Sequence, residues 1–281
     1  MADEFDAVFS AFPPEISEYT FTNLYAWRES YRFAVCRFRR HVLIRTLSPE
    51  GISPVFFPPV GPEPAVIVSE VLRARQGYFI RIPEAVARVI EQNRVIKVIE
   101  DRDNADYLYS VSALIELAGR RYDGKRNLIR NFQRNYQAEY VRLNGTDSDE
   151  VSAFEERWCA DKHCDEVTGL SQERRALREM FLHFSRFHLC AGGIRIGGVL
   201  CALAVGQRLN PQTLVVHILK ADAGKEGLYQ AMVQEFLRRE AGDVPLVNLE
   251  QDLGIPGLRQ AKQSYHPVGF VRKYRLEFSG E

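Results

Sequence analysis

The sequence lacks three features that often reveal where a protein works. It has no net charge, because 37 lysines and arginines balance 37 acidic residues, so attraction to nucleic acid or a membrane must come from a local patch. Its longest apolar stretches, such as GVLCALAVG, are too short to span a bilayer, and its acidic start is unlike a signal peptide. Its five scattered cysteines form no disulfide framework. These absences predict a cytoplasmic protein.

The motifs of several enzyme classes are also missing. The chain has no GxSxG elbow, no Walker loop and no dinucleotide-binding fingerprint. The stretch CADKHC (159–164) lacks the paired spacing of zinc ligands. We therefore expect no metal site and no required cofactor.

What the sequence does contain is a regular succession of strands and helices. Alternating apolar residues predict strands, and apolar residues three or four apart predict helices. In the first half we expect a hairpin, a third strand, a helix, a strand, a helix and a strand, at residues 32–47, 52–64, 65–76, 78–83, 84–93 and 95–110. Helices at 112–136, broken at Gly124, lead into the second half.

The second half follows the same order more fully. We expect a strand, two helices, three antiparallel strands, and then helix, strand, helix and strand, at 138–143, 148–164, 171–188, 189–210, 213–222, 224–241, 245–252, 255–265 and 268–278. This order is similar to that of the GNAT acyltransferase fold. The resemblance implies an α+β protein of two tandem GNAT folds, with mixed, mostly antiparallel sheets flanked by helices. We place the domains at 1–130 and 131–281.

Three stretches resemble one protein family. They are YTFTNLYAWR (19–28), ADYLYSVSALIELAGRRYDGKRNLIRNF (105–132) and NLEQDLGIPGLRQAKQSYHPVGFVRKY (248–274). The family is that of the C-terminal catalytic domain of phosphatidylglycerol lysyltransferases, and its stand-alone members match better. The resemblance implies tandem GNAT folds, as in Fem-type peptidyltransferases. It also implies transfer of an aminoacyl group from charged tRNA to a lipid headgroup or another amine or hydroxyl acceptor.

The third stretch concentrates candidate catalytic groups. Period two in LVNLEQD would place Asn248, Glu250 and Asp252 on one strand face. In a GNAT fold this strand borders the acyl-transfer cleft, so Glu250 is our candidate base, with Asn248 and Asp252 orienting it or the acceptor. A solvated sheet face explains the same pattern. Donors to an oxyanion or to phosphates would come from Lys262, Tyr265 and Lys273, and His266 is either a base or a packed residue.

A second candidate site is the turn KADAGKEGLYQAM (220–232). Gly224, Lys225 and Gly227 precede a helix whose first N–H groups suit a phosphate, and the GNAT resemblance implies that coenzyme A pyrophosphate binds there. A helix start that merely needs glycine is the alternative. The equivalent stretch of the first half, FFPPVGPEP (56–64), has prolines that remove backbone donors, so we expect the second half to be the active one.

The helix GRRYDGKRNLIRNFQR (119–134) is strongly basic. Arg126, Arg130 and Arg134 recur four residues apart on one face, and Lys125 and Asn127 lie beside them. This stripe can neutralise phosphates of tRNA or of an anionic lipid, or it is simply a solvated face.

These observations predict an acyltransferase that uses aminoacyl-tRNA as donor. Two alternatives remain open: an acetyl-CoA-dependent N-acetyltransferase of a small molecule, and a non-catalytic binding module that keeps the fold.

Overall fold

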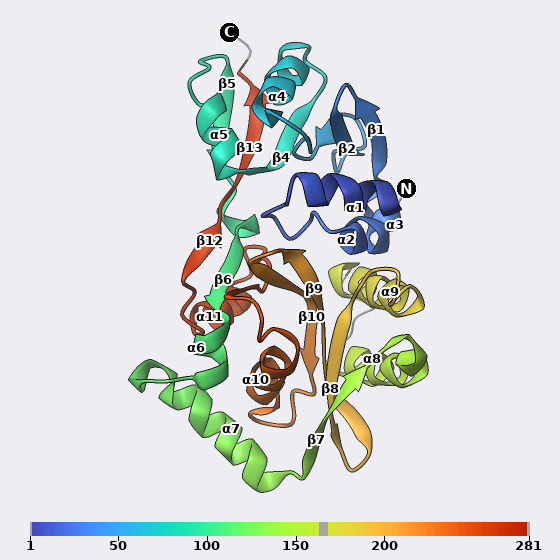
Figure 1. Ribbon diagram of the computed structural model, residues 1–281, viewed down its shortest axis with the longest axis vertical. Coiled ribbons are helices and arrows are strands. Elements are labelled where there is room, and N and C mark those ends of the chain that lie inside the picture. The colour runs from blue at the N-terminus through green and yellow to red at the C-terminus, as the bar shows by residue number, and fades with distance from the viewer. Residues whose placement is uncertain (1, 163–167, 280–281) are drawn as a thin grey trace. The chain divides into compact units, whose positions relative to one another are not determined.

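The computed structural model describes residues 2–162 and 168–279 (Figure 1). It confirms the α+β class with two mostly antiparallel sheets flanked by helices. The chain divides into two compact units, each discontinuous in sequence. The first unit contains Met1–Tyr107, Glu250–Ser264 and Gly269–Glu281, and the second contains Leu108–Leu249 and Tyr265–Val268. None of the helices in the described ranges is both long enough and apolar enough to cross a membrane.

The first unit is built on a sheet with the order β1-β2-β3-β4-β13-β5. The strands are β1 (Ala34–Phe38), β2 (His41–Leu47), β3 (Pro54–Phe56), β4 (Tyr78–Pro83), β13 (Lys273–Phe278) and β5 (Ile96–Glu100). Neighbours are antiparallel except for the parallel pair β3 and β4. A parallel pair needs a crossover, which here is the helix α4 (Pro64–Arg73).

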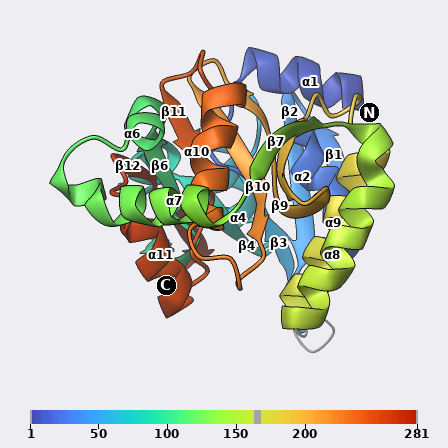
Figure 2. The same cartoon turned by 90° about the horizontal axis from the view of Figure 1, so that it is seen from below.

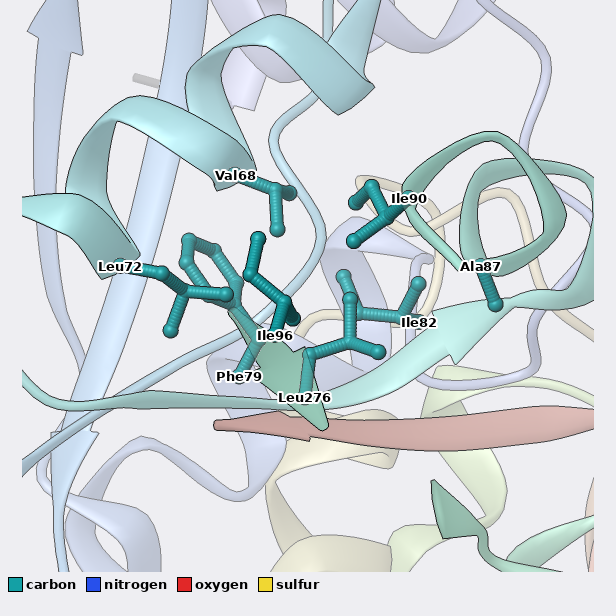
Figure 3. Packing of buried hydrophobic residues seen from close by; sticks show 8 residues of the cluster. All are labelled: Val68, Leu72, Phe79, Ile82, Ala87, Ile90, Ile96 and Leu276. Carbon is teal, nitrogen blue, oxygen red and sulfur yellow. The ribbon is translucent and has the colours of Figure 1, made fainter. Parts of the chain in front are cut away.

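Helices cover this first sheet and bury its core. The helices of this unit are α1 (Ala2–Ala11), α2 (Phe21–Ala26), α3 (Arg28–Tyr31), α4, α5 (Glu84–Ile90) and α11 (Pro256–Gln263), of which α4 and α5 pack on the sheet. Figure 3 shows side chains of α4 and α5, including Leu72 and Ile90, packing on Phe79, Ile82 and Leu276 of the strands. Leu276 is fully buried although it lies close to the C-terminus, so β13 is part of this core.

In the second unit the strands follow the order β6-β11-β10-β9-β8-β7. They are β6 (Asp106–Ser110), β11 (Leu246–Asn248), β10 (Thr213–Ala221), β9 (Val199–Asn210), β8 (Cys190–Ile196) and β7 (Ala138–Leu143). Among the pairs that join these six strands, β10 and β11 run parallel, and α10 (Leu228–Glu240) connects them. In this pair Thr213 lies opposite Leu246 and Val215 lies opposite Asn248, so the strand expected at 245–252 ends at Asn248.

Helices lie on both faces of this second sheet. They are α6 (Val111–Glu116), α7 (Asp123–Asn135), α8 (Ser148–Lys162), α9 (Thr168–Leu182) and α10. Figures 1 and 2 show α7 and α10 on one face and α8 and α9 on the other. Phe154 of α8 and Phe236 of α10 are fully buried against the sheet, which makes a core on each side.

The C-terminal strand joins the sheet of the other half of the chain. In the first sheet β13 pairs with both β4 and β5, while β6, from the first half, pairs with β11 in the second sheet. The remaining short strand, β12 (Gly269–Val271), neighbours β6. The compact units therefore depart from the division at residue 130, which falls inside α7. Order along the chain does not reveal such an exchange, because strand pairing is a non-local contact.

A helix break, three N-terminal helices and one cysteine differ from what the sequence predicts. The helix predicted at 112–136 breaks at Leu117 and Gly119, both with positive φ, instead of at Gly124. The helices α1 to α3 were not predicted. Cys159 is disulfide-bonded, which its scattered spacing did not suggest, whereas Cys36, Cys190 and Cys201 are free. His163 and Cys164 of the CADKHC stretch lie outside the described residues.

Candidate functional site

Asp252 anchors a tight polar turn of the first unit. The strand β11 ends at Asn248, and Glu250, Leu253 and Gly254 have positive φ, so the predicted alternation stops before Glu250. The fully buried Asp252 carboxylate accepts hydrogen bonds from Tyr107 Oη at 2.6 Å and from Arg259 Nε at 2.9 Å. The backbone N–H of Gly254 donates a further bond at 2.9 Å.

The hydrogen bonds to Asp252 determine its charge. Burial alone would raise the pKa of this carboxyl group, but the bonds from Arg259 and Tyr107 outweigh burial and hold the pKa well below its usual range. Arg102 adds an ion pair at 3.2 Å. Asp252 thus holds the chain's own groups, and it does not share a strand face with Glu250 as predicted.

Glu250 and Lys262 lie in the same unit, both half-buried. Glu250 Oε1 accepts a hydrogen bond from Asn23 Nδ2 at 3.3 Å, and Asn23 belongs to the YTFTNLYAWR stretch. Burial lowers the pKa of Lys262 to about 8, although the carboxylates of Glu250, Asp106 and Asp252 act in the opposite direction. Its Nζ lies 5.8 Å from the centre of the Tyr107 ring. The structure therefore offers a carboxylate and an amine that titrates near neutral pH.

Lys273 lies in a buried ionic cluster of the first unit. Its side chain is fully buried, and Nζ lies 2.6 Å from Asp106 Oδ1 and 2.7 Å from Glu18 Oε2. Asp106 also accepts hydrogen bonds from the backbone N and Oγ of Ser17, and Arg81 pairs with Glu18 at 2.9 Å. An ammonium enclosed in this way neutralises buried carboxylates, and donation by Lys273 to an oxyanion or to phosphates stays a prediction.

Asn248 and Tyr265 belong to the second unit. Asn248 is fully buried at the end of β11, opposite Val215 of β10 and Leu108 of β6. Tyr265 is 5% exposed, and Lys125 Nζ lies 4.0 Å from the centre of its ring. Burial raises the pKa of Tyr265 and lowers that of Lys125. Both predicted groups are thus embedded in the unit, and their catalytic roles stay predictions.

The start of α10 borders a pocket of about 370 Å³. Lys225 and Gly227 line it, together with Trp158, Lys162 and Tyr229, whereas exposed Gly224 does not. A Cβ on Gly227 would lie only 2.1 Å from the carbonyl oxygen of Leu128, so this glycine, with φ +82°, lets α10 approach α7. Lys225 Nζ is held by Asp222 Oδ2 at 3.1 Å. Both residues thus have structural partners, and phosphate binding here stays a prediction.

Lys220 forms a buried ionic cluster at this pocket that the sequence analysis missed. Its Nζ lies 2.6 Å from Glu155 Oε1, 2.8 Å from Glu173 Oε1 and 4.1 Å from the centre of the Trp158 ring. Lys220 and Glu155 side chains are each 4% exposed. The sequence contains an indication of this cluster, because Glu155 lies four residues from both Val151 and Cys159, on the buried face of α8. A glutamate on an apolar helix face requires a buried partner.

The basic stripe on α7 is less available than predicted. Arg126 folds back onto the chain, donating to the carbonyl oxygens of Leu117 and Gly119 and pairing with Asp123. Arg130 and Asn127 are exposed. Arg130 and Arg134 are exposed and form no ion pair within the described part of the chain, while Arg126 and Lys125 are engaged within the unit. Among the described residues, no His, Cys, Asp and Glu side chains form a metal-binding group of three or more.

The comparisons with known proteins agree with this architecture. The family model described as phosphatidylglycerol lysyltransferase, C-terminal, matches residues 9–277. The chain belongs to this family. Among curated proteins, none matches the sequence.

Solved structures share the fold over nearly the whole chain. A conserved protein of unknown function from Bacteroides thetaiotaomicron has 28% identity and a TM-score of 0.89, covering 99% of this chain and 97% of the other. L-PGS from Bacillus licheniformis has 11% identity and a TM-score of 0.70, covering 100% and 93%. The C-terminal domain of a putative lysylphosphatidylglycerol synthetase from Agrobacterium fabrum has 13% identity and a TM-score of 0.68, covering 99% and 91%. At 11% and 13% identity, the structures from Bacillus licheniformis and Agrobacterium fabrum show a shared fold and nothing more.

Proposed function

We propose that this protein transfers an aminoacyl group from aminoacyl-tRNA to an amine or hydroxyl acceptor, such as a lipid headgroup. Membership of the phosphatidylglycerol lysyltransferase C-terminal family supports the reaction class. The names of two solved relatives, L-PGS and a putative lysylphosphatidylglycerol synthetase, support an aminoacylated lipid as product. The identity of the donor, aminoacyl-tRNA, and that of the acceptor are both proposed here.

The observation that carries the proposal is the environment of Lys262. Its pKa of about 8 makes the ammonium a stronger acid than an ordinary lysine, while most of it remains protonated at pH 7. Proton transfer is efficient when the pKa of the catalytic group lies near the working pH. Glu250 is close enough for its charge to act on Lys262. The pair supplies one group that can accept a proton and one that can donate it.

These two groups account for each proton in the transfer. The acceptor's N–H or O–H gives its proton to the Glu250 carboxylate as the nitrogen or oxygen attacks the carbonyl carbon of the aminoacyl ester. The resulting tetrahedral oxyanion collapses, and the bond between the carbonyl carbon and the ribose oxygen breaks. The Lys262 ammonium gives its proton to that ribose oxygen. Asp252 takes no part, because its oxygens already hold Arg259 and Tyr107.

An acetyl-CoA-dependent N-acetyltransferase is the second candidate. The observation in its favour is the pocket at the start of α10, where the GNAT resemblance implies a coenzyme A pyrophosphate. Incubation with radiolabelled aminoacyl-tRNA pools in one arm, and with labelled acetyl-CoA in the other, distinguishes the two candidates. Each arm contains extracted lipids and a cell extract as acceptors. Label that moves only from acetyl-CoA would overturn the aminoacyl proposal.

The pH dependence of the reaction tests the roles of the two residues. Because Lys262 must be protonated, we expect kcat/KM to fall as the pH rises above about 8. Lys262→Arg keeps its charge at high pH but releases a proton poorly, so kcat should fall and the remaining activity should lose this decline. Glu250→Gln should lower kcat by ~10²–10⁴-fold, the usual contribution of a general base. The exposed changes Lys97→Arg and Glu116→Gln are the matched controls. Full activity of Glu250→Gln, or an unchanged alkaline decline in an active Lys262→Arg, would contradict these roles.

A further inference from the structure

The first unit carries a groove of about 840 Å³ between α4 and the end of α5. Figure 3 shows Val68 and Leu72 of α4 pointing into the core. The groove is lined by the neighbouring face of the helix, through Val66, Ser69 and Arg73, which are three and four residues apart. Its other wall contains Val89 and Arg94. The groove is therefore separate from the groups around Glu250 and Lys262.

The apolar part of the groove is unusually open to solvent. Val66 is 54% exposed and Val89 is 62% exposed, one on each wall. Single exposed valines are common on protein surfaces, and here two of them line the same groove, where they can bury apolar atoms of a partner.

The charged part of the groove is positive. Arg73 and Arg94 are both exposed, and among the described residues neither forms an ion pair. Glu70 is the one acidic residue of the lining, and Arg39 already pairs with it at 2.9 Å. The lining thus presents two arginines to an anionic partner, beside aliphatic side chains. Nucleic acid would match the arginines but would leave the valines in water.

We propose that the groove between α4 and α5 binds the surface of an anionic phospholipid bilayer. Arg73 and Arg94 contact lipid phosphates, and Val66 and Val89 enter the boundary between headgroups and acyl chains. Basic side chains are attracted to an anionic membrane surface, and apolar side chains beside them can enter the boundary between headgroups and acyl chains. The proposal stands on the groove alone and does not depend on the proposed aminoacyl transfer.

Sedimentation with vesicles tests this proposal. We expect the protein to bind vesicles of phosphatidylglycerol and phosphatidylcholine mixed in equal parts, and to bind pure phosphatidylcholine vesicles much more weakly. Each arginine near an anionic surface contributes ~1 kcal/mol, so Arg73→Ala with Arg94→Ala should lower the partition coefficient roughly 30-fold. Val66→Asp with Val89→Asp should also abolish binding, although both arginines remain. These residues are exposed, so the melting temperature should hardly change.

The matched control removes two other exposed arginines of the same unit. Arg32 and Arg45, like Arg73 and Arg94, form no ion pair among the described residues. Arg32→Ala with Arg45→Ala should leave vesicle binding within about threefold of the original, because these residues lie outside the groove. Equal losses in the two double variants, or equal binding to both kinds of vesicle, would overturn the proposal. Aminoacyl transfer to a soluble amine, measured in the same variants, should be unchanged, which separates this test from that of the reaction.

Discussion

At the scale of single residues, the partners of a carboxylate decide what it can do. Asp252 and Glu250 are two positions apart, but the first is fully buried among donors and the second is half-buried with an amide partner. An aspartate whose oxygens already accept charged hydrogen bonds stabilises the fold, and it has no vacant lone pair for a substrate. A half-buried glutamate close to a lysine retains the ability to accept a proton.

The role of Asp252 leads to a stability prediction. Asp252→Asn removes its ion pairs with Arg259 and Arg102, which are each about one-third exposed, and should lower the free energy of unfolding by roughly 1–3 kcal/mol. Asp103→Asn removes a 58% exposed partner of the same Arg259 and should cost less than about 1 kcal/mol. Urea denaturation of the three proteins measures both differences. Equal costs would show that Asp252 is not the anchor of the turn.

The stability lost in Asp252→Asn should depend on pH in a defined way. The pKa of Asp252 is lower in the folded protein than in the unfolded chain, so its contribution is complete above about pH 4 and is lost as the pH falls through the folded value. The difference in stability between the natural protein and Asp252→Asn should therefore shrink on acidification. A difference that stays constant down to the acid limit of folding would contradict the assigned pKa shift.

At the scale of elements, close helix packing explains a glycine that the sequence pattern assigned to a ligand. Gly227 lies at the start of α10 with φ +82°, and its α-carbon faces the Leu128 carbonyl oxygen on α7. Both the backbone conformation and the contact exclude a side chain. The neighbouring Gly224 has open space around it.

Replacing the two glycines by alanine should therefore affect the stability of the fold very differently. Gly227→Ala should lower the free energy of unfolding by more than about 1 kcal/mol, because alanine disfavours positive φ and its Cβ collides with α7. Gly224→Ala should change it by less than about 0.5 kcal/mol. Thermal melts followed by circular dichroism suffice for the comparison. If Gly227→Ala is as stable as Gly224→Ala, the packing role of Gly227 is refuted.

At the scale of the whole molecule, the exchange of C-terminal strands ties the two halves of the chain together. The strand β13 lies between β4 and β5 in the sheet of the first unit, and Leu276 completes its core. A chain cut at residue 130 would leave β4 and β5 without the strand that pairs with both. Such a half therefore lacks part of its own hydrophobic core.

Fragments of the chain test this dependence. We expect residues 1–130 expressed alone to show no cooperative unfolding transition, because β13 is missing and the cluster around Phe79 and Ile82 is open. The full chain should unfold cooperatively. Co-expression with residues 131–281 supplies β13 in trans and should restore the transition. A cooperative transition for residues 1–130 alone would show that the first half folds without the exchange.

The sequence by itself determined the succession of strands and helices from β1 onward, the α+β class and the family, because these depend on local periodicity and on continuous stretches such as 248–274, whereas helices α1 to α3 escaped it. It also pointed to Glu250 and Lys262. Only the tertiary structure decided which charged residues form buried ion pairs: Lys273 pairs with Asp106 and Glu18, and Lys220 pairs with Glu155 and Glu173. It also decided that β13 pairs within the first unit. Both are contacts between residues far apart in the chain, and no local pattern encodes which distant group will neutralise a charge or complete a sheet.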